Sequence, residues 1–193
     1  MRLFTGIALP EPVRDNIARV LRELRPLAPL TWSPVENLHI TSKFIGEWPE
    51  ERLSVLKKVL EKLDSPSGFD ITIERFGWFP NPHRPHALFI GVQAGPELTA
   101  LATTTEEALA QLGIPREKRP YSPHLTLARI KLEHLKQQNI RPVREHIANM
   151  TNFHFGTFPV SEFHLYLSRR SAYTPLVTYP LLAAASITTS IQA

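Results

Sequence analysis

The sequence has 193 residues, of which 42% are hydrophobic and 21% charged, with a net charge of +4 and no cysteine. This composition is typical of a soluble globular protein, and no apolar run approaches the roughly 20 residues that span a bilayer. The lack of cysteine excludes disulfides and thiolate metal sites, so we expect a cytoplasmic protein. The basic charge favours an anionic partner such as nucleic acid.

Alternating strand and helix patterns fill the first half of the chain. In order they predict a strand over 2–9, a helix over 13–24, a strand over 38–44, a helix from about 49 to 63, and a hairpin of strands 69–79 and 87–92. The second half predicts a helix over 96–112, a loop over 113–120, a strand near 124–129, a polar helical connector over 131–149, and closing strands over 153–168 and 176–182. This order predicts an α+β protein with helices packed outside the sheets.

No long polar linker interrupts these patterns. We therefore expect residues 1–182 to form a single domain. The uncharged tail over 183–193 has no clear period, and we expect it to be partly disordered.

Two strand-like stretches each place a histidine and a threonine two residues apart. They are NLHITSKF at 37–44 and SPHLTLAR at 122–129. Neighbouring residues of a strand face opposite sides, and this alternation divides each stretch into an apolar face and a His/Thr face. The predicted apolar faces are Leu38, Ile40, Ser42 and Phe44 in the first stretch, and Leu125 and Leu127 in the second.

The opposite faces carry His39 with Thr41 and His124 with Thr126, which converge if the two strands lie side by side. Two imidazoles can serve as acid and base near neutral pH, and threonine hydroxyls can donate hydrogen bonds to a phosphate between them. Such a site performs phosphoryl chemistry without a metal. A single His-x-Thr in a strand is commonly structural, so the pattern alone leaves a structural role and a shared active site both open.

Longer stretches around the motifs carry a family resemblance. They are RLFTGIALP, ENLHITSKFIGE, RPYSPHLTLARI, FHLYLSRRS and SAYTPL. With them the chain resembles, over most of its length, the two-histidine phosphoesterase superfamily, and within it the RNA 2′,3′-cyclic phosphodiesterases of bacteria and archaea, also named 2′-5′ RNA ligases. The resemblance implies two pseudo-symmetric lobes of antiparallel sheet around a central cleft, with helices outside. Ser42 and Lys43 depart from the apolar or small residues common after the first motif.

The resemblance also implies an activity and the residues that perform it. The activity is metal-independent hydrolysis of RNA 2′,3′-cyclic phosphate ends, including those of tRNA fragments, to a 2′-phosphate, with no cofactor. By position, His39 matches the proton donor to the leaving 3′ oxygen and His124 the proton acceptor that activates water. Thr41 and Thr126 match the residues that hold the phosphate oxygens.

Two further residues are candidates for substrate contact. Arg129 falls where relatives carry an arginine that contacts the phosphate. Strict alternation, however, places Arg129 on the face opposite His124, so it needs a bulge or a strand end to reach the site. Phe4 is a candidate contact for a base or ribose, with an ordinary core position as the alternative.

Three other functions remain open beside the hydrolase. The same histidines could join RNA ends through a 2′-5′ linkage, the reverse reaction. A non-catalytic RNA-binding module would not need two titratable imidazoles, and a histidine-dependent metallohydrolase would lose activity with a chelator. Nothing in the sequence demands more than a monomer.

Overall fold

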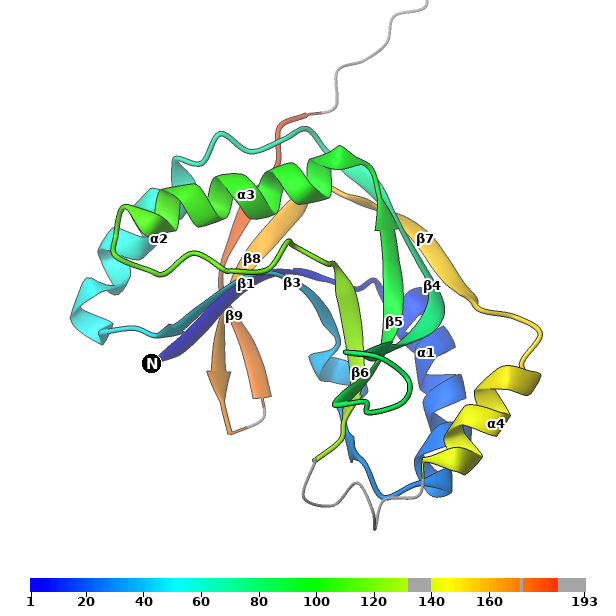
Figure 1. The fold of residues 1–193 in the computed structure, drawn as a ribbon. Coiled ribbons are helices and arrows are strands. Elements are labelled where there is room, and N and C mark those ends of the chain that lie inside the picture. The colour runs from blue at the N-terminus through cyan, green and yellow to red at the C-terminus, as the bar shows by residue number, and fades with distance from the viewer. Residues whose placement is uncertain (132–139, 171, 184–193) are drawn as a thin grey trace, which may run out of the picture.

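The computed structural model describes residues 1–131, 140–170 and 172–183, which form two antiparallel sheets with helices around them (Figure 1). The strands are β1 (Arg2–Ala8), β2 (Thr31–Trp32), β3 (His39–Glu47), β4 (Phe69–Phe79), β5 (Ala87–Ala94), β6 (His124–Arg129), β7 (His154–Val160), β8 (Glu162–Arg169) and β9 (Ala172–Pro180). The helices are α1 (Glu11–Leu24), α2 (Leu53–Glu61), α3 (Pro96–Ala110) and α4 (Arg141–Asn149). The predicted α+β class with antiparallel sheets is confirmed.

The chain passes repeatedly from one sheet to the other. The first sheet has the strand order β3-β1-β8-β9 and the second has the order β2-β6-β5-β4-β7. Helix α1 follows β1 of the first sheet but packs on β7 of the second, whereas α3 follows β5 of the second sheet and packs on β3 of the first (Figure 1). These crossings tie the two sheets together, and each sheet receives one of the two motif strands.

Local sequence explains where the first helix forms and which face it buries. Pro12 stands in the first turn of α1, where its missing N–H costs nothing. Val13, Ile17, Leu21 and Leu24 follow at helical spacing, and all four are buried. This apolar stripe joins a continuous cluster of buried residues drawn from both sheets and from the helices.

The end of the chain differs from the sequence prediction. The single strand predicted over 153–168 is wrong, because β7 and β8 are separate strands of different sheets. The chain leaves one sheet at Ser161 and enters the other. Strand β9 also begins earlier and ends sooner than the strand predicted over 176–182.

The predicted connector and tail are only partly described. Helix α4 accounts for the last part of the helical connector predicted over 131–149, while 132–139 lie outside the described residues. Nearly all of the tail predicted to be partly disordered, 184–193, also lies outside them. No helix within the described ranges is long and apolar enough to cross a membrane.

Candidate active site

The two motif strands meet although they belong to different sheets. Strands β3 and β6 contact each other, and the histidines that begin them, His39 and His124, lie close enough for one charge to influence the other. A hydrogen bond links the two segments, because the Tyr121 hydroxyl donates to the Thr41 carbonyl oxygen at 2.9 Å. Thr41 and Thr126 are half-buried beside their histidines. The structure thus brings together the two segments that the sequence predicts to share a site.

Both imidazoles are oriented by the same backbone contact. His39 Nδ1 lies 2.7 Å from the carbonyl oxygen of Asn37, and His124 Nδ1 lies 2.8 Å from that of Ser122. A carbonyl oxygen only accepts, so Nδ1 carries the hydrogen in both rings. Each Nε2 is thereby left to exchange a proton with a substrate.

Aromatic rings pack around each imidazole. The His39 ring lies 4.5 Å from the ring of Phe4 and 4.9 Å from that of Tyr173, measured between centroids. The His124 ring lies 4.9 Å from Phe79 and 5.6 Å from Phe89. These contacts restrict the rotation of both imidazoles, which preorganises them for proton transfer.

Phe4 is a buried residue that packs against the aromatic rings near His39. Only 3% of its surface is exposed, and it stacks on Tyr166 with 5.0 Å between the ring centroids. A contact between Phe4 and a base or ribose stays a prediction.

The first motif contains a β-bulge that changes which side chains are buried. In the pairing of β1 with β3, Thr5 lies opposite Lys43 and Gly6 opposite Thr41, so Ser42 is an extra residue. Ser42 and Lys43 are therefore both buried, and the alternation reverses after them. The prediction that Phe44 lies on the apolar face is wrong, because this residue is 51% exposed.

The second motif has a bulge at the same relative position. Phe89 pairs with Thr126 and Leu88 with Ala128, which leaves Leu127 as the extra residue. Leu127 and Ala128 are both fully buried, so Arg129 returns to the face that carries the motif histidine. This is the bulge that Arg129 needs in order to reach the site.

The pKa of His39 is lowered by its surroundings. Burial is the largest cause, the hydrogen bond to the Asn37 carbonyl opposes it, and the charges of His124 and Arg129 lower the pKa further. His39 is therefore mostly neutral near pH 7 in the free protein. An anionic phosphate beside the ring would favour its protonated form.

An ion pair between the buried Lys43 and the partly exposed Glu106 fixes the loop before the second motif. Lys43 Nζ lies 2.6 Å from Glu106 Oε1 on α3 and 2.9 Å from the carbonyl oxygen of Pro115. The Glu117 N–H donates to the same carboxylate at 2.7 Å. This hydrogen bond and the one from Lys43 are the largest causes that hold the pKa of Glu106 below its usual range. The signal in the sequence was the departure of Lys43 from an apolar residue.

We expect Glu106→Ala to destabilise the protein by about 3 kcal/mol, because it leaves the charge of Lys43 buried without a counter-ion. Lys43→Met fills the same space with an apolar side chain and is expected to cost less than about 1 kcal/mol. Urea unfolding of both variants, with the exposed Glu107→Ala as control, measures the difference. Equal losses in the two variants would show that the buried charge is not the cause.

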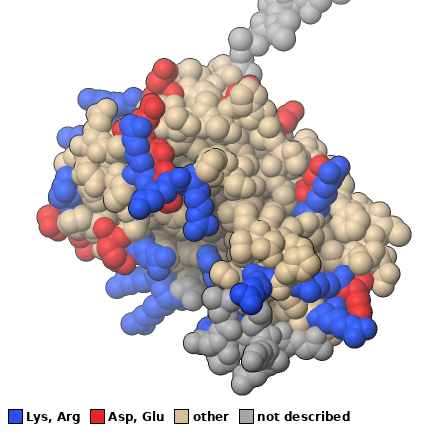
Figure 2. Space-filling model, in the orientation of Figure 1, with Lys and Arg blue, Asp and Glu red and all other residues tan. Residues whose placement is uncertain are grey.

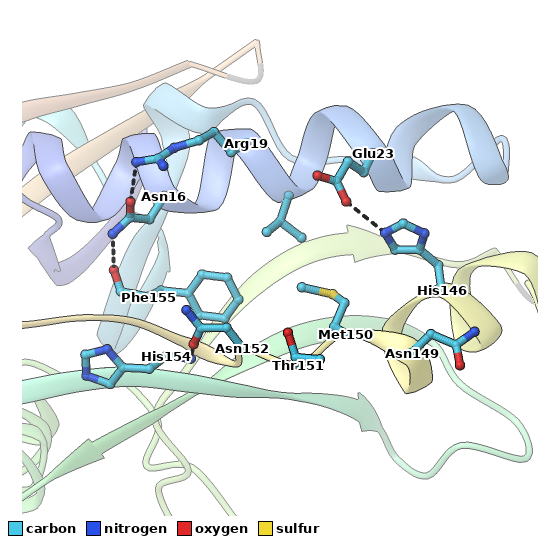
Figure 3. Close-up of a pocket in the computed structure, with 11 residues that line it drawn as sticks. Asn16, Arg19, Glu23, His146, Asn149, Met150, Thr151, Asn152, His154 and Phe155 are labelled. Atoms are coloured by element: carbon cyan, nitrogen blue, oxygen red, sulfur yellow. Dashed lines mark hydrogen bonds and ion pairs between the residues drawn. The ribbon is translucent and has the colours of Figure 1, made fainter.

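The described part of the chain has two hollows of note, and a motif histidine lines only the smaller of these two. The larger, of about 510 Å³, lies between α1, α4 and the start of β7, and contains none of the motif residues (Figure 3). Arg19 and Asn16 form a hydrogen-bonded chain on one side of it, and His146 pairs with Glu23 on the other (Figure 3). The smaller, of about 210 Å³, is lined by His39.

Each of the two hollows is lined by one guanidinium and one carboxylate side chain: Arg19 and Glu23 line the larger, and Arg14 and Glu36 the smaller. Lys and Arg side chains cover more of the face shown in Figure 2 than Asp and Glu side chains do. Among the described residues, no cluster of three or more His, Asp or Glu side chains could hold a metal ion.

Comparison with known proteins relates most of the chain to one family. The family model described as LigT like Phosphoesterase matches residues 7–89 and, a second time, residues 90–177, so each match contains one motif. An RNA 2′,3′-cyclic phosphodiesterase of Archaeoglobus fulgidus is 34% identical over 175 residues, which cover 91% of this chain and 93% of that protein. One of the same description from Thermus thermophilus is 36% identical over 141 residues, or 68% of this chain and 69% of the relative.

Solved structures give the same relationship. A crystal structure from Thermus thermophilus has a TM-score of 0.73 and 27% identity, covering 95% of this chain and 99% of that one. The crystal structure of Escherichia coli LigT complexed with 3′-AMP has a TM-score of 0.72 and 27% identity, covering 93% and 97%. The likeness therefore extends over both sheets and both motifs.

Proposed function

The chain belongs to the LigT-like phosphoesterase family, and from this we propose that it hydrolyses the 2′,3′-cyclic phosphate ends of RNA to 2′-phosphates. His39 and His124 act as acid and base, and no metal is needed. The names of the relatives support the substrate class, and the geometry of the two motifs supports the mechanism.

One observation carries the proposal: the two histidines are held in the same way, on two strands that contact each other. Each Nδ1 is held by the carbonyl oxygen two residues earlier, and each motif strand comes from its own sheet. A structural histidine needs no such counterpart. A pair with both Nε2 atoms free is what an in-line displacement requires, since one proton must leave the attacking water while another reaches the departing oxygen.

The proposed step balances within these residues. His124 Nε2 takes a proton from water as the oxygen forms its bond to phosphorus, and the bond from phosphorus to the 3′ oxygen breaks. Protonated His39 gives its Nε2 proton to that 3′ oxygen, which leaves a 2′-phosphate. Thr41 and Thr126 donate hydroxyl hydrogens to the non-bridging oxygens, and the charge of Arg129 stabilises the negative charge that builds up on them.

The test is hydrolysis of a short RNA that ends in a 2′,3′-cyclic phosphate, followed by ³¹P NMR of the product. We expect a 2′-phosphate and a free 3′ hydroxyl. A 3′-phosphate would assign the leaving group to the other oxygen and contradict the role of His39. Joined RNA as the main product at micromolar RNA would favour the reverse, end-joining reaction.

A further inference from the structure

The smaller hollow borders His39 and has a distinctive polar lining. It lies where the end of β1, the start of α1, the segment before β3, and strands β8 and β9 come together. Its polar lining consists of Arg14, Glu36, Asn37, His39, Tyr166 and Tyr173. Its remaining residues are apolar, which gives a small pocket with several convergent hydrogen-bonding groups.

The cation in this hollow is available to a ligand. The Arg14 side chain makes no hydrogen bond or ion pair with another described residue. Burial raises the pKa of Tyr166 to about 12, and the nearby charge of Arg14 opposes that rise. Tyr166 therefore keeps its hydroxyl hydrogen at neutral pH and can donate it beside the guanidinium.

Ring contacts hold in place the two tyrosines that line the hollow, Tyr166 and Tyr173. The Tyr166 ring stacks on Phe4 with 5.0 Å between centroids, and the Tyr173 ring meets His39 edge-on at 4.9 Å. A guanidinium pairs well with a phosphate, and phenolic hydroxyls beside it can donate further hydrogen bonds to the same oxygens. Glu36, at the same hollow, can only accept, which suits a ribose hydroxyl or a base amine.

We propose that this hollow is a subsite for the phosphodiester that precedes the terminal nucleotide of the RNA. The inference rests on the proposed function, in which His39 protonates the 3′ oxygen of the terminal ribose. That ribose then lies against His39, and the adjoining hollow offers the preceding part of the RNA chain a place beside this side chain. His39 lines the hollow, and among the other described lining residues Arg14 supplies the cation.

The subsite predicts a preference for RNA over single nucleotides. A 2′,3′-cyclic mononucleotide has no phosphodiester on its 5′ side and cannot use Arg14. A charge-assisted contact of this kind corresponds to about 10- to 100-fold in kcat/KM. We therefore expect a dinucleotide with a 2′,3′-cyclic end to exceed the cyclic mononucleotide of the same terminal base by this factor.

Arg14→Gln tests the assignment, with Arg19→Gln as the matched control on the same helix at the larger hollow (Figure 3). We expect Arg14→Gln to lower kcat/KM for the dinucleotide about 10- to 100-fold more than for the mononucleotide, and Arg19→Gln to keep the wild-type ratio. Equal losses on both substrates, or no wild-type preference for the dinucleotide, would overturn the subsite.

A binding measurement separates this inference from the proposed reaction. The probes are a dinucleotide and a mononucleotide that each end in a 2′-phosphate, titrated by calorimetry with wild type and Arg14→Gln. The subsite predicts tighter dinucleotide binding that depends on Arg14, whether or not the protein turns over cyclic ends. Equal dinucleotide affinity in wild type and Arg14→Gln would overturn the subsite. Dinucleotide binding that depends on Arg14, without turnover of cyclic ends, would contradict only the proposed reaction.

Discussion

Replacing either motif histidine with alanine is expected to lower kcat on RNA 2′,3′-cyclic phosphate ends by about 10²- to 10⁴-fold. Each histidine handles one of the two protons that move in the displacement, so neither can substitute for the other. The variants are His39→Ala and His124→Ala, with His154→Ala as control, because that exposed histidine contacts Thr157 and lies at the larger hollow. The control should retain the wild-type kcat.

The double variant sharpens this test. Because both histidines act in one step, His39→Ala/His124→Ala should lose little more than the worse single variant. Losses that multiply would mean that the two act in separate steps. A single variant that is folded by circular dichroism and retains wild-type kcat would remove that histidine from the mechanism.

Arg129→Gln is expected to have the second-largest effect, a loss of about 10²-fold in kcat/KM. The second bulge puts Arg129 on the motif face, where its charge both attracts the phosphate and helps to lower the pKa of His39, which burial lowers most. Removing the charge should raise the pKa of His39. The acid side of the pH profile of kcat/KM, set by the lower apparent pKa of the pair, should then move to higher pH.

The measurement is kcat/KM from pH 5 to 9 for wild type, Arg129→Gln and the exposed control Arg84→Gln. The wild-type profile should be bell-shaped, with its acid side below the ordinary histidine pKa of 6.5. A lower rate with an unchanged acid side would show that Arg129 acts on the phosphate without influencing His39. A kcat/KM of Arg129→Gln equal to that of wild type would show that Arg129 has no role in the reaction.

Periodicity was sufficient to predict most of the fold. The apolar stripe of α1 and the hairpin of β4 and β5 follow from residue spacing and from the proline-rich turn between the strands. The break between β7 and β8 could not be predicted from spacing. The chain passes from one sheet to the other at Ser161, and the sequence there shows no glycine-rich turn. Sheet membership depends on long-range pairing, which a local pattern does not reveal.

The motif residues were predictable because strand alternation places His39 with Thr41 and His124 with Thr126. The bulges were not, since a single extra residue leaves no signature in composition. As a result Phe44 was assigned to the apolar face and is exposed, while Arg129 needed a bulge that only the structure could supply.

Groups that support the site were missed because their partners are distant in sequence. Tyr121 reaches the Thr41 carbonyl across 80 positions, and Lys43 reaches Glu106 across 63. Arg14 lines the same hollow as His39 because α1 begins soon after β1 ends, and β1 pairs with the motif strand. The departure of Lys43 from the apolar or small residues common after the first motif was the one visible hint.

The most direct test of the central claim is multiple-turnover hydrolysis of an RNA with a 2′,3′-cyclic phosphate end in excess chelator. Wild type, His39→Ala and His124→Ala would be compared at equal folded concentration. We predict full turnover by wild type and a loss of at least about 10²-fold in both variants. Wild-type activity that disappears with chelator and returns with a divalent metal would contradict the two-histidine mechanism, as would undiminished activity in either variant.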